Sequence, residues 1–148
     1  RAVAFDFYAD LYPFRNDLNR VPASRFGLTW LVNSERVKEQ PMIGGRAAIT
    51  DLALHEGIAR ANDGVRALDF DPASEVIAIE IPADWTRLQA EETQAAQEWR
   101  TVTDALFARW IGLDAGKFVV SGVGILGDRR FLIAEAATPN LFARLAAS

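Results

Sequence analysis

The sequence predicts an α+β fold in which a mixed sheet packs against one long helix. Residues 2–8, 26–32 and 75–81 have the β-branched and aromatic content of strands. Residues 85–110 repeat apolar positions at steps of three and four, as an amphipathic helix does. Residues 117–134 then have the pattern of a hairpin with a glycine in its turn. Strands on both sides of one long helix are typical of the α+β class.

Composition limits the classes of function. The chain has 148 residues, of which 50% are hydrophobic, so it can fill a core as one domain or as a part-domain with an extension. Its net charge of −4 argues against nucleic acid as the main partner, because phosphate binding needs a basic face. The absence of cysteine excludes disulfides, thiol nucleophiles and cysteine-based zinc sites. No run reaches the roughly 18 apolar residues of a membrane span, so we expect a cytoplasmic protein without a membrane partner.

The first predicted strand begins at the second residue of the chain. There is no initiator methionine, and Arg1 leads directly into the strand at 2–8. We therefore expect a neighbouring strand that lies outside this sequence, on an upstream segment or on a second chain. Residues 33–74 are rich in polar and turn-forming residues, and we expect them to be the least regular part. Within them, residues 47–54 fit a short strand or one helical segment equally well.

The strand at 75–81 has isoleucines at alternating positions on one face, and Pro82 ends it. Asp84 is well placed to cap the next helix. That helix, at 85–110, would be about 39 Å long if unbroken, at ~1.5 Å per residue, and we expect a bend near Ala90. Its apolar stripe is predicted to comprise Ala95, Trp99, Val102, Leu106 and Trp110.

The chain is predicted to close with a hairpin and a short helix. The hairpin strands are expected at 117–123 and 130–134, with Gly127-Asp128 at the turn. The last helix is expected at 141–146. Gly122-Val123-Gly124 lies within the hairpin and not between a strand and a helix, so we interpret it as strand-bulge and turn glycine, not as a dinucleotide loop.

The loop between the first two strands is the best candidate site. Tyrosine hydroxyls can donate or accept a proton, arginine can hold a carboxylate with two hydrogen bonds, and asparagine can bind amide or hydroxyl groups. The candidate substrate-binding residues are Tyr8, Tyr12, Arg15, Asn16, Asn19 and Arg25. A loop ordered by its own hydrogen bonds explains the same residues equally well.

Four other residues have a structural interpretation that we favour over a functional one. His55, next to Glu56, is expected to be a surface histidine near a turn. Glu80 lies in an otherwise apolar strand, where an exposed sheet face is a commoner explanation than a partner or a ligand. Trp99 and Trp110 are expected in the core or at an interface with a partner, and not around a cofactor.

Three segments resemble, in the same order, the C-terminal part of a group of predicted acetyltransferases of the GNAT superfamily. The segments are FYADLYPFRNDLNRVPASRFGLTWLV, EVIAIEIPADWTRL and QEWRTVTDALFARWI. The resemblance implies that residues 2–8 and 26–32 are the last two strands of a GNAT-like sheet, followed by an extension of strand, long helix and hairpin. The implied parts are 1–35 as the closing strands of the core, 36–74 as an irregular connection and 75–148 as an α/β extension.

The resemblance also implies a reaction. GNAT enzymes pass an acetyl group from acetyl-CoA to an amine, and hold the pyrophosphate on a glycine-rich loop that opens a helix. No such loop occurs in this sequence. We therefore expect the chain to supply acceptor-side surface for a small-molecule amine, and a missing N-terminal half or a second chain to bind acetyl-CoA. No catalytic residue of the family can be carried over to this sequence by motif.

A second hypothesis comes from another class of function. The chain could be a non-catalytic binding or assembly module that pairs through an open strand edge at residues 2–8 or through the tryptophan-rich helix. Exposed strand edges favour pairing with another chain, so this hypothesis predicts a homo-oligomer or a domain-swapped assembly.

Overall fold

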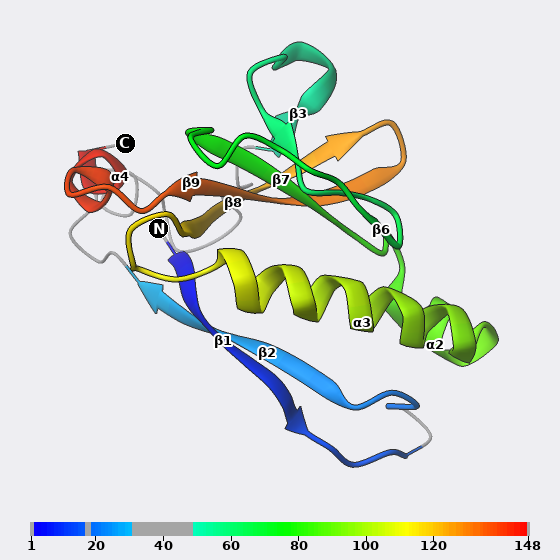
Figure 1. The fold of residues 1–148 in the computed structure, drawn as a ribbon. Helices are drawn as coiled ribbons and strands as arrows, with labels where there is room; N and C mark the ends of the chain where they lie inside the picture. The colour runs from blue at the N-terminus through cyan, green and yellow to red at the C-terminus, as the bar shows by residue number, and fades with distance from the viewer. Residues whose placement is uncertain (1, 17–18, 31–48, 148) are drawn as a thin grey trace, which may run out of the picture.

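The computed structural model describes residues 2–16, 19–30 and 49–147. Within them a seven-stranded mixed sheet has the order β2-β1-β8-β9-β7-β4, and β3 pairs in parallel with β8 (Figure 1). The sheet packs against a long helix, so the predicted α+β class is confirmed. None of the described helices is long and apolar enough to cross a bilayer.

The N-terminal hairpin consists of β1 (Ala2–Tyr12) and β2 (Ala23–Trp30). Both strands are longer than the predicted strands at their loop-side ends, and residues 31–32 of the second prediction lie outside the described residues. β1 lies between β2 and β8, because Ala4 pairs with Val120 of β8. The expected open edge at residues 2–8 is therefore occupied at its beginning by a strand of this chain. β2 lies at the end of the sheet.

Short elements fill residues 49–74. They are β3 (Ile49–Asp51), the 3₁₀ turn η1 (Leu52–Leu54), β4 (Ala59–Arg60), β5 (Asn62–Asp63) and β6 (Arg66–Ala67). The sequence pattern fitted a strand and a helical segment equally well here. Residues 49–54 contain both, first a strand and then a helical turn. Residues 31–48, which include part of the predicted irregular connection, lie outside the described residues.

The predicted long helix is two helices, α2 (Trp85–Glu91) and α3 (Thr93–Trp110), which break at Glu92 and not at Ala90. They follow β7 (Val76–Ile81). The Asp84 side chain accepts a hydrogen bond from the backbone N–H of Arg87, which confirms the predicted cap.

The buried face of α3 is wider than the predicted stripe. Leu106 is buried as expected, but Ala95, Trp99, Val102 and Trp110 are only partly buried. The other buried residues of α3 are Ala96, Thr103 and Phe107. The reason is that α3 packs on β7 on one side and on the β1–β2 hairpin on the other (Figure 1). A helix held between two surfaces buries more than one stripe.

The C-terminal hairpin consists of β8 (Phe118–Leu126) and β9 (Arg129–Ala136), followed by α4 (Leu141–Ala147). Its register shifts between Val120 and Gly122, and Gly127 lies in the turn with φ 61°, so the structural interpretation of these glycines is confirmed. Gly124 has a different role. A Cβ there would lie 2.8 Å from Ile133 Cδ1 and 3.2 Å from Thr50 O, so only glycine lets β3 approach β8.

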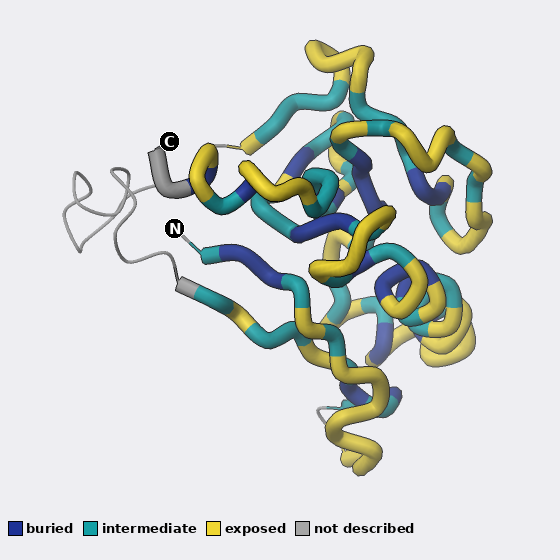
Figure 2. Tube along the Cα trace, turned by 60° about the vertical axis from the view of Figure 1, so that its left-hand side comes forward, coloured by how far each residue is buried: buried dark blue, intermediate teal, exposed yellow. Residues whose placement is uncertain are grey.

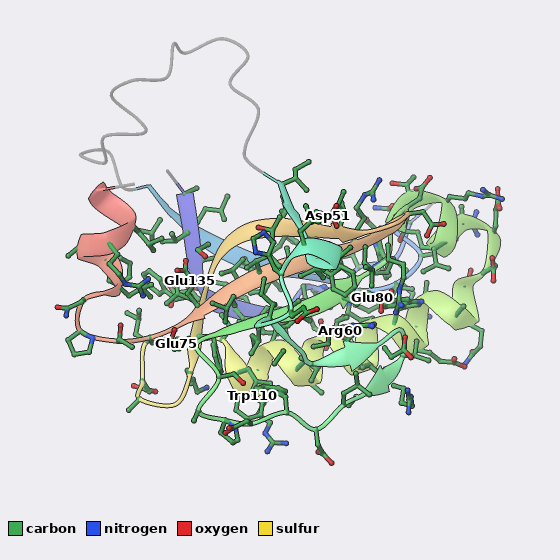
Figure 3. The ribbon with its side chains drawn as sticks, turned by 90° about the horizontal axis from the view of Figure 1, so that it is seen from above. Asp51, Arg60, Glu75, Glu80, Trp110 and Glu135 are labelled. Atoms are coloured by element: carbon green, nitrogen blue, oxygen red, sulfur yellow. The ribbon has the colours of Figure 1, made fainter. Side chains whose placement is uncertain are left out.

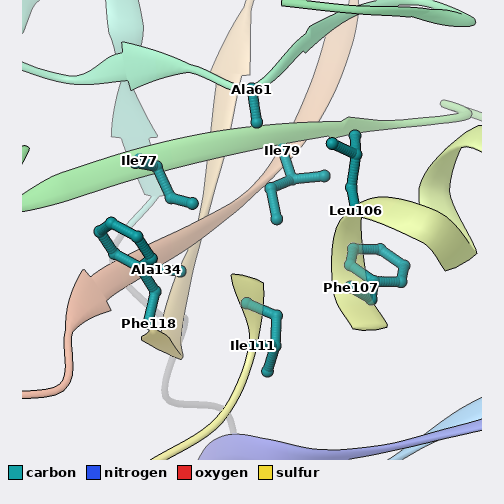
Figure 4. Close-up of a cluster of buried hydrophobic side chains, with 8 residues drawn as sticks. All are labelled: Ala61, Ile77, Ile79, Leu106, Phe107, Ile111, Phe118 and Ala134. Carbon is teal, nitrogen blue, oxygen red and sulfur yellow. The ribbon is translucent and has the colours of Figure 1, made fainter. Parts of the chain in front are cut away.

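The core lies on both faces of the sheet. On the α3 face, Ile77, Ile79, Leu106, Phe107 and Phe118 belong to the largest buried cluster (Figure 4). On the other face, α4 covers the start of β1 and β8 through Leu141 and Leu145. Figure 2 shows the interior strands as buried and the far end of the β1–β2 hairpin as exposed.

Candidate functional site

Three of the predicted site residues lie together on the β1–β2 hairpin. The strand register places Tyr8 directly opposite Arg25. The Arg25 Cζ lies 5.5 Å from the centroid of the Tyr12 ring, a cation–π contact. Tyr8 and Tyr12 are 49% and 50% exposed, so both can meet a partner from solvent. We call the surface formed by these three residues and Asp6 the hairpin face.

Asp6 joins the hairpin face because of a glycine on the opposite strand. Asp6 pairs with Gly27, and a Cβ at Gly27 would lie 3.3 Å from the Asp6 Cβ and 3.5 Å from Tyr8 Cε2. The Asp6 and Tyr8 side chains therefore flank the space above Gly27. Our sequence analysis did not include Asp6 in the site. Period-two alternation from Tyr8 along the same strand was the signal that could have identified it.

The other three candidates lie in the connection beyond the strands. The backbone N–H of Asn19 donates to Asn16 Oδ1 at 2.8 Å, and the backbone N–H of Asn16 donates to Asn19 O at 2.9 Å. This is the self-ordered loop that the sequence left open as an alternative. Arg15 is exposed immediately before it. The structure thus assembles Tyr8, Tyr12 and Arg25, and gives both asparagines a role in the turn.

A polar cluster joins the hairpin to α3. Ser24 Oγ donates to Asp104 Oδ2 at 2.8 Å and accepts the backbone N–H of Asp10 at 3.1 Å. Arg100 donates to the backbone oxygen of Pro22, and its guanidinium lies 4.9 Å over the Trp85 ring. Asp10 has φ 49°, at the irregular part of the β1–β2 register. These contacts fix the angle at which the hairpin leaves the sheet.

Burial shifts the pKa of both charged groups of this cluster. It raises the pKa of the Asp104 carboxyl, against the hydrogen bond from Ser24 and the charge of Arg100. It also lowers the pKa of the Arg100 guanidinium. Ser24 and Asp104 are 80 residues apart, and no local sequence pattern connects them. Their pairing is a consequence of tertiary structure alone.

Glu80 is buried, so our favoured interpretation of an exposed sheet face is wrong. Its residue exposure is 5%, and its carboxylate accepts Arg129 Nε at 2.7 Å and the Gly64 backbone N–H at 2.7 Å. Arg60 Nη2 lies 3.6 Å from Glu80 Oε2. Figure 3 shows Arg60 and Glu80 as neighbours. β7 lies between β9 and β4, so a carboxylate here needs partners from the chain itself.

Asp63 extends this network to the surface. It lies 2.6 Å from Arg129 Nη2 and 3.2 Å from Arg66 Nη2. Arg129 and Arg66 hold the pKa of Asp63 below its usual range, and Glu80 raises the pKa of Arg129. Each carboxylate of the network is paired within the chain, so we assign the network a stabilising role.

The remaining candidate residues do not form a site among the described residues. His55 is exposed at the end of η1, as predicted for a surface histidine near a turn. Trp110 packs against Phe70 and Phe118 at ring distances of 4.7 Å and 6.1 Å, so this tryptophan belongs to the core. In the described part of the chain, no three histidine, cysteine or acidic side chains are grouped as metal ligands.

The described residues line two clefts, of which the first meets the hairpin face only at Asp6 and the second lies away from it. The first, of about 490 Å³, lies between β1 and the C-terminal end of α3. The second, of about 420 Å³, lies between the start of β7, the end of β9 and α4, with Glu75, Glu135 and Arg144 on its walls. Glu135 accepts Ser121 Oγ at 2.5 Å and lies 3.4 Å from Arg144, so its charge is partnered. Neither cleft is lined by Tyr8, Tyr12 or Arg25.

Comparison with known proteins adds no relative. No family model, no curated protein and no solved structure matches the chain.

Proposed function

We propose that this chain supplies acceptor-side surface to a GNAT-like N-acyltransferase, which moves an acetyl group from acetyl-CoA to a small-molecule amine. One observation carries the proposal in addition to the sequence resemblance. Tyr8, Tyr12 and Arg25 lie together on an exposed hairpin face, in the segment where the resemblance is most continuous.

The hairpin face has suitable groups for an amine acceptor. The Asp6 carboxylate attracts an ammonium group, and the tyrosine hydroxyls can accept or donate a hydrogen bond as the amine loses its proton. Arg25 can bind a carboxylate or phosphate elsewhere on the acceptor. Asp6 and Tyr8 lie close together over Gly27, so one acceptor can contact both side chains from solvent.

The described residues do not fit the acetyl-CoA pyrophosphate. The turns before α2 and α3 contain Pro82-Ala83-Asp84 and Glu92, and not the glycine-rich loop that exposes backbone N–H groups to phosphate. Asp84 and Glu92 would also repel an anion. We therefore propose that another polypeptide segment, upstream or on a second chain, binds acetyl-CoA.

The test is acetyl transfer to a panel of amines by the intact gene product. We expect Tyr8→Phe and Arg25→Ala to raise the KM for the amine by about tenfold or more, because each removes a hydrogen bond to a charged group worth ~1.5–3 kcal/mol. Arg87→Ala is the matched control, since Arg87 is an exposed arginine on α2 that is paired with Glu91. Equal KM values for Arg25→Ala and Arg87→Ala would refute the assignment of the hairpin face.

Calorimetry with acetyl-CoA tests whether the cofactor binds to this chain or to another polypeptide segment. We expect no saturable binding to this chain alone. Clear binding would show that a cofactor site exists within these residues and would overturn that part of the proposal.

The alternative is a non-catalytic assembly module. β2 is an end strand of the described sheet and presents Leu28 at 63% exposure, which favours pairing with another strand. The tryptophan-rich helix supports this alternative less, since Trp110 packs inside the chain. A monodisperse monomer at high concentration, measured by size exclusion with light scattering, would count against it.

A further inference from the structure

The first cleft is a gap in the sheet beside β1. β8 begins at Phe118 and runs antiparallel to β1, and the two strands pair only through Ala4 and Val120. β1 continues to Tyr12, so most of its length passes the start of β8. Figure 1 shows the beginning of β1 next to the C-terminal end of α3. The cleft of about 490 Å³ lies at this divergence.

One wall of the cleft is the outer edge of β1. Asp6, Phe7 and Tyr8 pair with β2, the register is irregular from there to Tyr12, and among the described residues none of 6–12 has a strand partner on the other side. The regular part of this edge, before the irregularity around Asp10, is about 10 Å long at ~3.3 Å per residue. Its outward backbone N–H and C=O groups can form hydrogen bonds with an added strand, which is a recurring mode of peptide recognition.

The facing wall presents one exposed apolar side chain, and the rim is acidic. That side chain is Leu113, which is 51% exposed, whereas Phe107 and Ile111 behind it are buried. Asp6 and Asp114 lie on the rim, and neither has an ion pair among the described residues. The C-terminal end of α3 adds partial negative charge, while Lys117 Nζ donates to the Ala108 carbonyl oxygen at 3.2 Å.

We propose that this cleft binds an extended, basic polypeptide segment from another protein, which adds to the edge of β1 as a strand. In an extended segment successive side chains point to opposite sides, so an apolar side chain meets Leu113 while lysine or arginine side chains reach the acidic rim. A second copy of this chain is a poorer fit, because its net charge is −4. The inference rests on the cleft alone and does not depend on acyl transfer.

The probe is a short capped peptide of alternating lysine and valine. Two matched peptides are a glutamate–valine version and a version with a central proline, which lacks a backbone N–H. Binding is measured by calorimetry, and its place by the amide NMR signals of the chain. We expect saturable binding of the lysine peptide, with the largest shifts at Phe7 and Ala9, and much weaker binding of both controls.

Two variants locate the site. Asp114→Lys should weaken binding of the lysine peptide about fivefold or more, since it replaces attraction with repulsion at the rim. Leu113→Ser should weaken it about fivefold by removing apolar contact. The controls are Asp128→Lys, at the exposed turn between β8 and β9, and Leu54→Ser, which changes an exposed leucine on η1. Both controls should bind as the unaltered chain does.

Several results would overturn the proposal. They are no binding of the lysine peptide, equal binding of the glutamate peptide, shifts confined to residues outside the cleft, or an Asp114→Lys variant that binds normally. A dimer in light scattering whose β1 amides are already protected from exchange would assign the edge to a second copy, and would also reject a foreign peptide as the occupant.

Discussion

Replacement of Glu80 by alanine should destabilise the protein more than replacement of any exposed carboxylate. Glu80 is buried, and its carboxylate accepts hydrogen bonds from Arg129 and from the Gly64 backbone. Removing it leaves the Gly64 N–H without an acceptor and removes the charge that Arg129 faces. Both effects lower the free energy of unfolding.

The free energy of unfolding lost in Glu80→Ala depends on which partners Arg129 and the Gly64 N–H still have. Removing one partner of a fully buried ion pair costs ~3–5 kcal/mol, because the other charge is left without compensation. The Arg129 side chain, however, is 34% exposed and keeps Asp63 at 2.6 Å, so water and Asp63 still stabilise it. The orphaned backbone N–H costs ~1–3 kcal/mol. We therefore expect Glu80→Ala to lower the free energy of unfolding by about 2–3 kcal/mol.

The assay is denaturant unfolding followed by tryptophan fluorescence, with a double-mutant cycle. Glu80→Gln keeps an acceptor for the Gly64 N–H and should cost about half as much as the alanine variant. Glu80→Ala combined with Arg129→Ala should be less destabilising than the sum of the single changes, by about 1 kcal/mol or more. Equal slopes against denaturant would show that the comparison is one of stability.

Glu91→Ala is the matched control. Glu91 is exposed and pairs with Arg87 at 2.9 Å on one helix, an arrangement worth at most about 0.5 kcal/mol. If Glu80→Ala costs no more than Glu91→Ala, the buried network does not stabilise the fold and the reasoning fails.

Two further predictions concern the packing of the hairpin on α3. Phe107→Ala should lower the free energy of unfolding by about 3–5 kcal/mol, because Phe107 is 7% exposed and its ring contacts Phe7 and Phe26 of the hairpin. Leu54→Ala on the surface should cost under about 0.5 kcal/mol, and similar losses for the two variants in denaturant unfolding would contradict this prediction. The second concerns Asp104, whose pKa is raised by burial, so the folded state keeps this proton to higher pH than the unfolded chain. The contribution of Asp104 is therefore most favourable below its ordinary pKa of 3.8 and declines as pH rises towards the raised value. Asp104→Asn should flatten this decline in unfolding free energies measured across that pH range, and an unchanged pH profile would show that Asp104 titrates normally.

The elements could be predicted because each has a local cause. Alternating isoleucines predict β7, Asp84 supplies the cap of α2, and Gly127 supplies the left-handed turn between β8 and β9. The break at Glu92 was placed two residues too early because no proline or glycine marks it.

The candidate site could be predicted only in part. Tyr8, Tyr12 and Arg25 were identified by side-chain type, and the strand register brings them together. Asn16 has the same polar character, yet its side chain accepts a hydrogen bond from the backbone N–H of Asn19 within the turn. The type of a residue determines which groups its side chain can bind. Whether that side chain is available for a ligand depends on its contacts within the folded chain.

By itself, the sequence determined the α+β class, the strand and helix patterns and the polar character of the hairpin, because these depend on contacts between residues close in the chain. Only the tertiary structure decided the insertion of β1 between β2 and β8, the burial of Glu80 and the pairing of Ser24 with Asp104. The partners in these contacts are tens of residues apart. Their meeting depends on the order of the strands in the sheet and on where α3 packs, and no local pattern encodes either.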